Sequence, residues 1–224
     1  MKLWLFSSGC GQDNEAIDLE LIRSIYNPRP KLTFIPASFE EADDYYDEFI
    51  ERFSDYTYAH FNIFHADQSF DYKKWQNALQ SDMIYLSGGN TYHLLASLQR
   101  SGIGRELIKY IAKGGLVAGH SAGAIVTTPI ISTAGYPVSE ADDNYLNLKD
   151  LSGLNLVPFE IFPHYDNSPL HNRALKKESS KGAYPIYALY DGAAIAIEGH
   201  KISFFGAIDR FEDGTKAAIG LDTD

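Results

Sequence analysis

The sequence predicts an α/β protein in three layers, with a mainly parallel sheet covered by helices on both faces. From residue 2 to residue 118, short apolar runs of strand length alternate with segments whose apolar residues recur at helical spacing. Hydrophobic residues make up 45% of the chain and charged residues 22%, an ordinary balance for a globular protein. No repeat, low-complexity segment or linker divides the 224 residues. We therefore expect one domain spanning residues 1–224.

The first third of the chain contains three expected strands and two expected helices. Lys2–Ser7 is a short buried strand, and the helix Asn14–Tyr26 follows it with apolar residues at helical spacing. Lys31–Ile35 is a second strand, which ends before a proline. Glu40–Phe53 is an amphipathic helix whose acidic start favours a helix N-terminus. Tyr58–Phe64 is the third strand.

The middle of the chain continues the alternation up to a glycine-rich turn. The expected elements are the helix Tyr72–Leu79, the strand Met83–Leu86, the helices Tyr92–Gln99 and Arg105–Ala112, and the strand Leu116–Ala118. This regular succession of strands and helices is the pattern that favours parallel pairing.

The pattern changes after residue 127. The segment Thr128–Asp150 is rich in loop-forming residues. A strand and a helix are then expected at Phe159–Pro163 and Ser168–Ser179. Three closely spaced strands follow, at Ile186–Tyr190, Ala193–Glu198 and Lys201–Phe205, the last two joined as a hairpin by Gly199 and His200.

A nucleophile motif lies directly after the strand Leu116–Ala118. Residues Gly119 to Gly123 read Gly-His-Ser-Ala-Gly, which is the G-x-S-x-G pattern with a strand before it and helix-compatible residues after it. The glycines permit a sharp turn. Such a turn lifts the Ser121 hydroxyl clear of the sheet, at a helix N-terminus where backbone N–H groups can meet an oxyanion. The motif therefore predicts acyl transfer through Ser121.

A serine nucleophile needs a base and an orienting carboxylate. His164 is the best candidate base, because it follows an apolar strand, where parallel α/β sheets place working residues. Asp191 follows another strand and is the first candidate carboxylate, with Asp166, Asp142, Asp143 and Glu140 as rivals. The competing histidines are His60, His65, His93, His120, His171 and His200, and the side chain of His120 must point away from Ser121 if the turn is tight.

A second glycine turn supplies the remaining part of an oxyanion hole. Besides the amide of Ala122, the turn Ser87-Gly88-Gly89-Asn90-Thr91 lies between a strand and a helix, with N–H groups free to point into a cleft. It lacks the Lys-Ser/Thr ending of a P-loop and the spacing of G-x-G-x-x-G. No paired-histidine metallopeptidase motif occurs. We expect no cofactor and no metal.

The net charge, the cysteine count and the lengths of the apolar runs limit which partners and which cellular compartment we expect. The net charge of −11 argues against nucleic acid as a partner. The one cysteine, Cys10, excludes an internal disulfide and a cysteine zinc cluster. The apolar run at the start is too short for a signal peptide, and no later run is long enough to span a membrane. We therefore expect a cytoplasmic enzyme that does not bind membranes.

Together these motifs resemble the peptidase E family of serine peptidases, which includes aspartyl dipeptidase and, more distantly, cyanophycinase. Four blocks match in order across about Lys2–Phe205: Gly88-Gly89-Asn90-Thr91, Gly119-His120-Ser121-Ala122-Gly123-Ala124, Pro163-His164-Tyr165-Asp166-Asn167 and Tyr190-Asp191-Gly192. The resemblance implies a class I glutamine amidotransferase-like (flavodoxin-like) fold with serine in place of cysteine. It implies Ser121 as nucleophile, His164 as base and acid, Asp191 as its orienting group, and the Gly89 and Ala122 amides as the oxyanion hole.

The resemblance also implies a substrate and shows where this chain departs from the pattern. A small peptide would be the substrate of a monomer or homodimer, with Asn90, Asn167 and Arg173 as candidate binding residues. Aspartyl dipeptidases carry an Asp after the elbow, where this chain has Gly135, and an arginine beyond the histidine block, for which only Arg173 is available. We therefore expect a serine dipeptidase or exopeptidase of unassigned specificity. The alternatives are an amidase or esterase, or a binding module that has lost catalysis.

Overall fold

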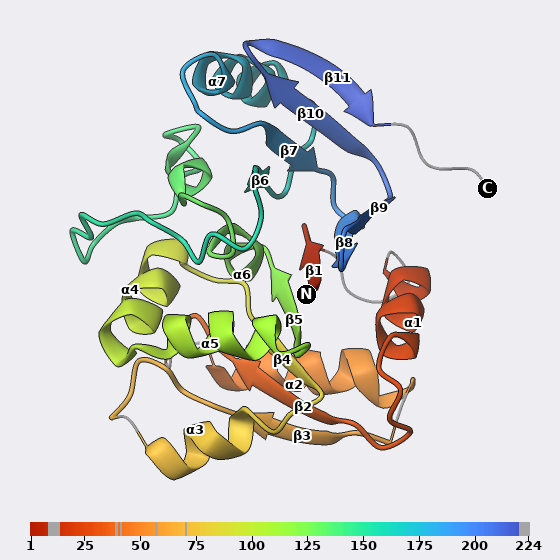
Figure 1. The fold of residues 1–224 in the computed structure, drawn as a ribbon. Helices are drawn as coiled ribbons and strands as arrows, with labels where there is room; N and C mark the ends of the chain where they lie inside the picture. Colours follow the sequence, from red (N-terminus) through yellow and green to blue (C-terminus); the bar gives the residue numbers. More distant parts are fainter. Residues whose placement is uncertain (9–13, 39, 41, 57, 70, 220–224) are drawn as a thin grey trace.

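Two β-sheets organise the molecule (Figure 1). The computed structural model describes residues 1–8, 14–38, 40, 42–56, 58–69 and 71–219. A seven-stranded sheet has the order β3-β2-β4-β5-β1-β8-β9, and a four-stranded sheet has the order β11-β10-β7-β6. The strands are β1 Lys2–Phe6, β2 Lys31–Ile35, β3 His60–Ile63, β4 Met83–Leu86, β5 Leu116–His120, β6 Glu160–Phe162, β7 Ile186–Leu189, β8 Ala194–Glu198, β9 Lys201–Phe205, β10 Ile208–Glu212 and β11 Thr215–Ile219.

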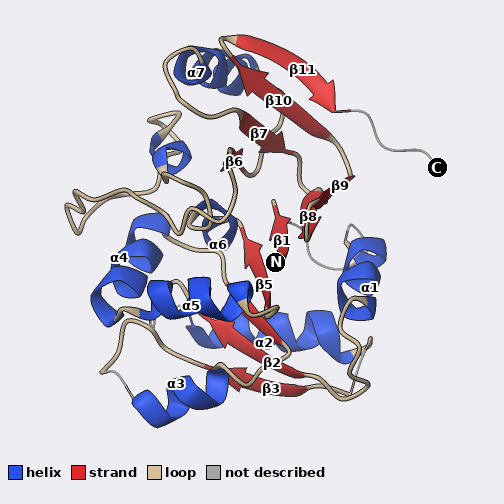
Figure 2. Cartoon of the chain, in the orientation of Figure 1, coloured by secondary structure: helices blue, strands red, loops and turns tan. Residues whose placement is uncertain are grey.

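Helices cover both faces of the large sheet (Figure 2). The helices are α1 Glu15–Arg23, α2 Ala42–Ser54, α3 Tyr72–Ala78, α4 Thr91–Ser101, α5 Ile103–Ala112, α6 Ala122–Ile125 and α7 Pro169–Ser179, with a short 3-10 helix at Ser132–Gly135. Apolar residues of α1 and α2 share one core cluster with one face of the strands, and those of α3 to α6 share another cluster with the opposite face. This division follows from the strand pleat, which sends alternate side chains to opposite faces.

The prediction of a mostly parallel central sheet flanked by helices is confirmed. The strands β3, β2, β4, β5 and β1 pair in parallel, and β8 and β9 extend the sheet as an antiparallel edge. The expected hairpin through Gly199 and His200 is the β8–β9 pair. The predicted helix Glu40–Phe53 begins at Ala42 in the structure, and Glu41 and Cys10 lie outside the described residues.

The sequence predicts one sheet, but the described residues form two. The last third of the chain forms the second sheet. In it β6 and β7 pair in parallel, while β7, β10 and β11 pair antiparallel. The hairpin β10–β11 follows the last predicted strand and was not anticipated. Helix α7 packs its Leu175 against this sheet with Phe162, Ile186 and Phe211. The chain leaves the small sheet after β7 and enters the large one at β8, so the residues between them lie at the junction.

No helix in the described ranges is both long enough and apolar enough to cross a lipid bilayer.

Candidate active site

The nucleophile motif forms a strained turn between β5 and α6. Ser121 has φ 49° and ψ −109°, a conformation that L-residues rarely adopt. The two motif glycines allow the turn to pack closely. A Cβ on Gly119 would lie 2.4 Å from the Gly123 carbonyl oxygen, and one on Gly123 would lie 2.1 Å from the Leu86 carbonyl oxygen. The motif thus needs glycine at both positions for steric reasons.

The three residues that the sequence singled out for catalysis meet at one point. Ser121 Oγ lies 2.9 Å from His164 Nε2, and His164 Nδ1 lies 3.2 Å from Asp191 Oδ1. The side chains of His164 and Asp191 are 51% and 62% exposed, so the set is open to solvent and to substrate. His164 follows β6 and has φ 55°, and its ring contacts Ser121, which follows β5 of the large sheet. Nucleophile, imidazole and carboxylate are therefore in the order that serine acyl transfer requires.

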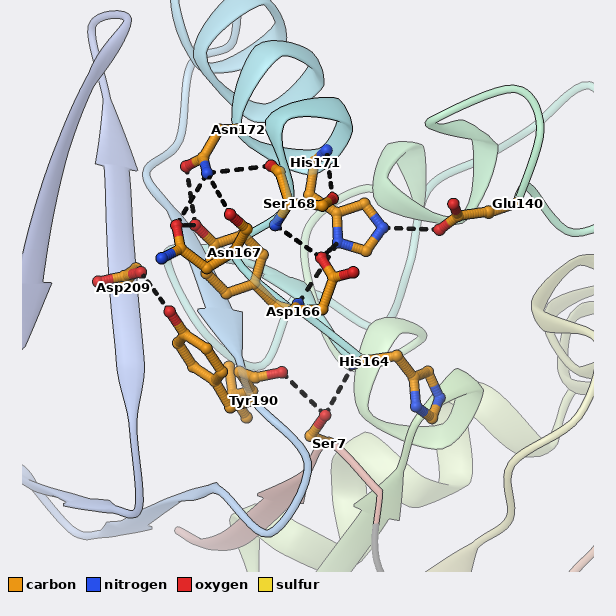
Figure 3. Close-up of polar contacts among 12 residues, drawn as sticks. Ser7, Glu140, His164, Asp166, Asn167, Ser168, His171, Asn172, Tyr190 and Asp209 are labelled. Carbon is orange, nitrogen blue, oxygen red and sulfur yellow. Dashed lines mark hydrogen bonds and ion pairs between the residues drawn. The ribbon is translucent and has the colours of Figure 1, made fainter.

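Two serines at the end of β1 hold the histidine and the carboxylate in place, and sequence reasoning missed both. Ser7 Oγ accepts a hydrogen bond from the backbone N–H of His164 at 2.8 Å and lies 2.9 Å from the Leu189 carbonyl oxygen (Figure 3). Ser8 Oγ donates to Asp191 Oδ1 at 2.5 Å. The sequence could have indicated both residues, because they directly follow a buried parallel strand. The carboxyl ends of such strands form the edge of the sheet at which functional residues lie.

Both predicted oxyanion donors have unused N–H groups. Gly89, with φ 117°, follows β4, and Ala122 is the first residue of α6. Within the described part of the chain neither N–H takes part in a hydrogen bond. Backbone donors left open beside a nucleophile can stabilise a developing oxyanion.

A cavity of about 100 Å³ lies next to Ser121 and His164. Its remaining lining residues are Thr91, Ile125, Thr133, Ala134, Tyr136, Pro137, Glu140, Asp142, Phe162, Pro163 and His171. Figure 3 shows His171 between two carboxylates: its Nε2 lies 2.7 Å from Glu140 Oε2 and its Nδ1 2.7 Å from Asp166 Oδ1. The ring of His171 is 5% exposed. Nothing in the sequence around His171 indicates that its ring is buried in the lining of the cavity that Ser121 also lines.

Three of the four rival carboxylates, those of Glu140, Asp166 and Asp142, have other partners. Glu140 and Asp166 bind His171, and Asp142 accepts the backbone N–H of Thr91 at the start of α4 at 2.8 Å. The backbone carbonyl of Asp143 accepts from the side chain of Asn90. In this arrangement Asp191 is the carboxylate hydrogen-bonded to His164.

The three candidate binding residues lie outside the cavity lining. Asn90 caps α4 by accepting the N–H of His93. Asn167 Oδ1 lies within hydrogen-bond distance of Tyr165, Asn172 and Lys216. Arg173 is exposed on α7. The Asn90 and Asn167 side chains thus support local structure in this conformation.

The unanticipated hairpin reaches toward the loops that carry His164 and Asp191. Lys216 Nζ, on β11, lies 2.8 Å from Asp209 Oδ2 and 2.6 Å from Asn167 Oδ1. Asp209 in turn accepts from the hydroxyl of Tyr190, the residue before Asp191, at 3.2 Å. The Asp213-Gly214 pair between β10 and β11 is a hairpin signal that could have predicted these strands.

His120 is part of the support beneath the elbow. Its ring stacks near Tyr85, with ring centroids 6.4 Å apart. Burial, aided by the neighbouring Arg52 charge, lowers the pKa of His120 to about 3. The ring is therefore neutral at physiological pH.

Comparisons with known proteins identify the family to which the chain is similar. The sequence model described as Peptidase family S51 matches residues 3–205. The chain is 30% identical to a peptidase E of Nostoc sp. over 186 aligned residues. The alignment covers 79% of this chain and 72% of that protein. A crystal structure of a candidate peptidase E protein from Listeria monocytogenes EGD-e has a TM-score of 0.70 at 29% identity, covering 91% of this chain and 96% of the other.

Other relatives match over shorter segments. An uncharacterized peptidase of Listeria monocytogenes serovar 1/2a is 36% identical over 124 residues, which is 55% of this chain. The chain spans 60% of that protein's length, and 46% and 42% of the lengths of uncharacterized peptidases from Pasteurella multocida and Listeria innocua. These matches concern about half of each relative.

Proposed function

The chain belongs to peptidase family S51, and from this premise we propose that it hydrolyses short peptides through an acyl-enzyme on Ser121. One observation carries the proposal: Ser121 Oγ lies 2.9 Å from His164 Nε2, and the other nitrogen of that ring lies 3.2 Å from Asp191 Oδ1. This is the relation of nucleophile, base and orienting carboxylate that activates a serine. The relatives named peptidase E support the same reaction class.

In the first half of the proposed reaction, Ser121 Oγ attacks the peptide carbonyl carbon while His164 Nε2 takes the hydroxyl proton. The carbonyl oxygen becomes an oxyanion facing the free N–H groups of Gly89 and Ala122. Asp191 accepts a hydrogen bond from the Nδ1–H group of His164 and stabilises the imidazolium without taking its proton. When the C–N bond breaks, His164 gives its proton to the leaving amine, and an ester of Ser121 remains.

In the second half, water attacks the ester carbon and gives a proton to His164 Nε2. Collapse of the second tetrahedral intermediate releases the new carboxylic acid, which loses its proton to water, and His164 returns its own proton to Ser121 Oγ. Atoms and charge balance without any cofactor, so none enters the scheme. The small cavity beside Ser121 suits one side chain, which favours dipeptides and other short peptides over folded protein. We also propose that the fold placing these groups is of the glutamine amidotransferase-like (flavodoxin-like) class that the sequence resemblance implies.

A dipeptide panel tests the proposal. Purified protein is incubated with Xaa-Leu dipeptides that differ in the first residue, and released leucine is quantified by mass spectrometry. We expect hydrolysis by the wild-type protein and a loss of at least about 10⁴-fold in Ser121→Ala, with an unchanged circular dichroism spectrum. Hydrolysis of p-nitrophenyl acetate but of no peptide would favour an esterase. Folded protein that cleaves neither substrate would favour a binding module.

A further inference from the structure

We propose that the cavity beside Ser121 binds a cationic side chain, that of Lys or Arg, on the residue whose carbonyl is attacked. The inference rests on the proposed peptidase function, because it assigns the substrate side chain of the same site. It departs from the acidic substrates that the sequence resemblance would suggest. The charge of the cavity carries it, and the mixed lining and two unpaired hydroxyl groups agree with it.

The charge of the cavity is negative. Glu140 and Asp142 line it, and no Lys or Arg does so among the described residues. The imidazole of His171 is shared between Glu140 and Asp166. The lining has two carboxylates and two imidazoles, and Asp166, just outside the lining, adds a third carboxylate. The net charge around the cavity is therefore negative even when both histidines are protonated. An acidic substrate side chain would meet repulsion at this site, and a cation would meet attraction.

Among the described residues that line the cavity, no Lys or Arg is present to pair with an acidic substrate side chain. Arg173, the candidate for that role, is exposed on α7 and lies outside the lining. Gly135 stands where the aspartyl dipeptidase pattern has an Asp. It lies in the 3-10 helix that precedes the lining residues Tyr136 and Pro137. The chain thus has acidic groups near the nucleophile in place of a basic one.

The lining combines apolar and polar parts in a way that fits a long cationic side chain. Ile125, Phe162 and Pro163 supply apolar surface, and Glu140 and Asp142 supply carboxylates. Lys and Arg bury their methylene stems against apolar surface and keep their charged ends among polar groups. A cavity of about 100 Å³ can hold several water molecules, which is enough room for a stem of this kind.

Two threonines that line the cavity are buried and have unpaired hydroxyl groups among the described residues. Thr91 is 1% exposed and Thr133 is 3% exposed. Within the described ranges, Oγ1 of each has no hydrogen-bond partner. Leaving a buried hydroxyl unpaired is unfavourable, and the ammonium of Lys or the guanidinium of Arg carries donors for such oxygens. The two threonines therefore add polar side chains to the lining, and the charge of the cavity carries the inference.

Binding to an inactive variant tests the inference apart from catalysis. Calorimetry on Ser121→Ala measures the Kd of Lys-Leu, norleucine-Leu and Asp-Leu, where norleucine matches the lysine stem without its charge. We expect Lys-Leu to bind at least about tenfold more tightly than norleucine-Leu, and Asp-Leu to bind most weakly. Adding Glu140→Gln, which keeps an oxygen acceptor for His171, should bring the Lys-to-norleucine ratio close to one. Adding Glu106→Gln, which removes an exposed carboxylate from α5, should leave the ratio unchanged.

The outcomes separate this inference from the proposed function. Tight binding of Lys-Leu to the Ser121→Ala variant, together with no hydrolysis by the wild-type protein, would support the inference and contradict the peptidase proposal. Hydrolysis with Asp-Leu as the best substrate would support the peptidase proposal and overturn the inference. Equal Kd values for Lys-Leu and norleucine-Leu would overturn it as well, as would a preference for Lys-Leu that Glu140→Gln does not reduce.

Discussion

The two sheets contribute different halves of the candidate site. The large sheet presents Ser121 and the amides of Gly89 and Ala122, all within or beside turns that follow its parallel strands β4 and β5. The small sheet presents His164 and Asp191, at the ends of its strands β6 and β7. The nucleophile half depends on a local turn. The base half depends on contacts between distant segments, such as that of His164 with Ser7, 157 residues away in the chain.

The positions of His164 and Asp191 relative to Ser121 therefore depend on the contacts between the two sheets. Ser7 and Ser8 at the end of β1 hold the backbone of His164 and the carboxylate of Asp191 against the large sheet. On the other side, Lys216 and Asp209 brace the same loops from the small sheet. Changes in the two halves should therefore have different signatures: the first should affect folding or the nucleophile, and the second should affect its activation.

Removing the charge of the orienting carboxylate should have the largest effect on the base half. Asp191→Asn should lower kcat by about 10⁴-fold, because an amide in this place favours the wrong tautomer of the imidazole. Steady-state kinetics on the best dipeptide measures the change, and Asp166→Asn is the matched control, since Asp166 pairs with His171 instead. A loss of less than tenfold in Asp191→Asn would show that another carboxylate orients His164.

A methyl group in the elbow should damage the nucleophile half through folding. In Gly123→Ala the new Cβ would lie 2.1 Å from the Leu86 carbonyl oxygen, and relief of that clash requires the turn to move away from β4. We expect a loss of about 3 kcal/mol or more in the free energy of unfolding, measured by urea denaturation. The control Gly182→Ala meets nothing closer than 3.4 Å and should be nearly neutral. Equal stability of the two variants would contradict the packing argument.

Loosening the small sheet should slow the reaction without unfolding the nucleophile half. Lys216→Met removes the partner of Asp209 and of Asn167, so the loops carrying His164 and Asp191 lose a constraint. We expect kcat to fall by about 10- to 100-fold with little change in KM, and Lys216→Arg to restore most of it.

Tyr190→Phe provides a second, milder test of the same bracing, because it removes only the hydrogen bond to Asp209. It should lower kcat by a smaller factor than Lys216→Met does. Surface variant Lys181→Met serves as the control for loss of a positive charge. Wild-type kcat in both Lys216→Met and Tyr190→Phe would show that the hairpin does not position the site.

The smallest expected effect concerns the pH dependence of stability. The pKa of His120 in the folded protein is lowered to about 3 by burial, from about 6.5 in an unfolded chain. A lowered folded pKa gives stability that is present above pH 6.5 and lost as the pH falls toward 3. From pH 6.5 to pH 5.5 this histidine should cost about 1 kcal/mol, measured by urea denaturation. His120→Gln should flatten the profile by that amount, and an unchanged profile would contradict it.

The same division between local and distant contacts explains what the sequence could predict. The turn Gly119–Gly123 and the strand before it were predictable, because steric rules act on neighbouring residues. His164 and Asp191 were found as strand-end residues, although nothing in the sequence gives the distance between them. The second sheet was missed, because strand pairing across the chain leaves no local pattern. The hairpin carrying Lys216 did leave one, the Asp213-Gly214 turn. The partners of His171 depend on the tertiary fold alone.

Active-site labelling tests the central claim most directly. A fluorophosphonate probe is added to the folded protein, and the modified residue and the labelling rate are measured by mass spectrometry. We expect a single adduct on Ser121, no adduct in Ser121→Ala, and labelling at least about 100-fold slower in His164→Ala. No adduct on folded wild-type protein, or the same rate in His164→Ala, would contradict the claim that the small sheet activates the nucleophile of the large one.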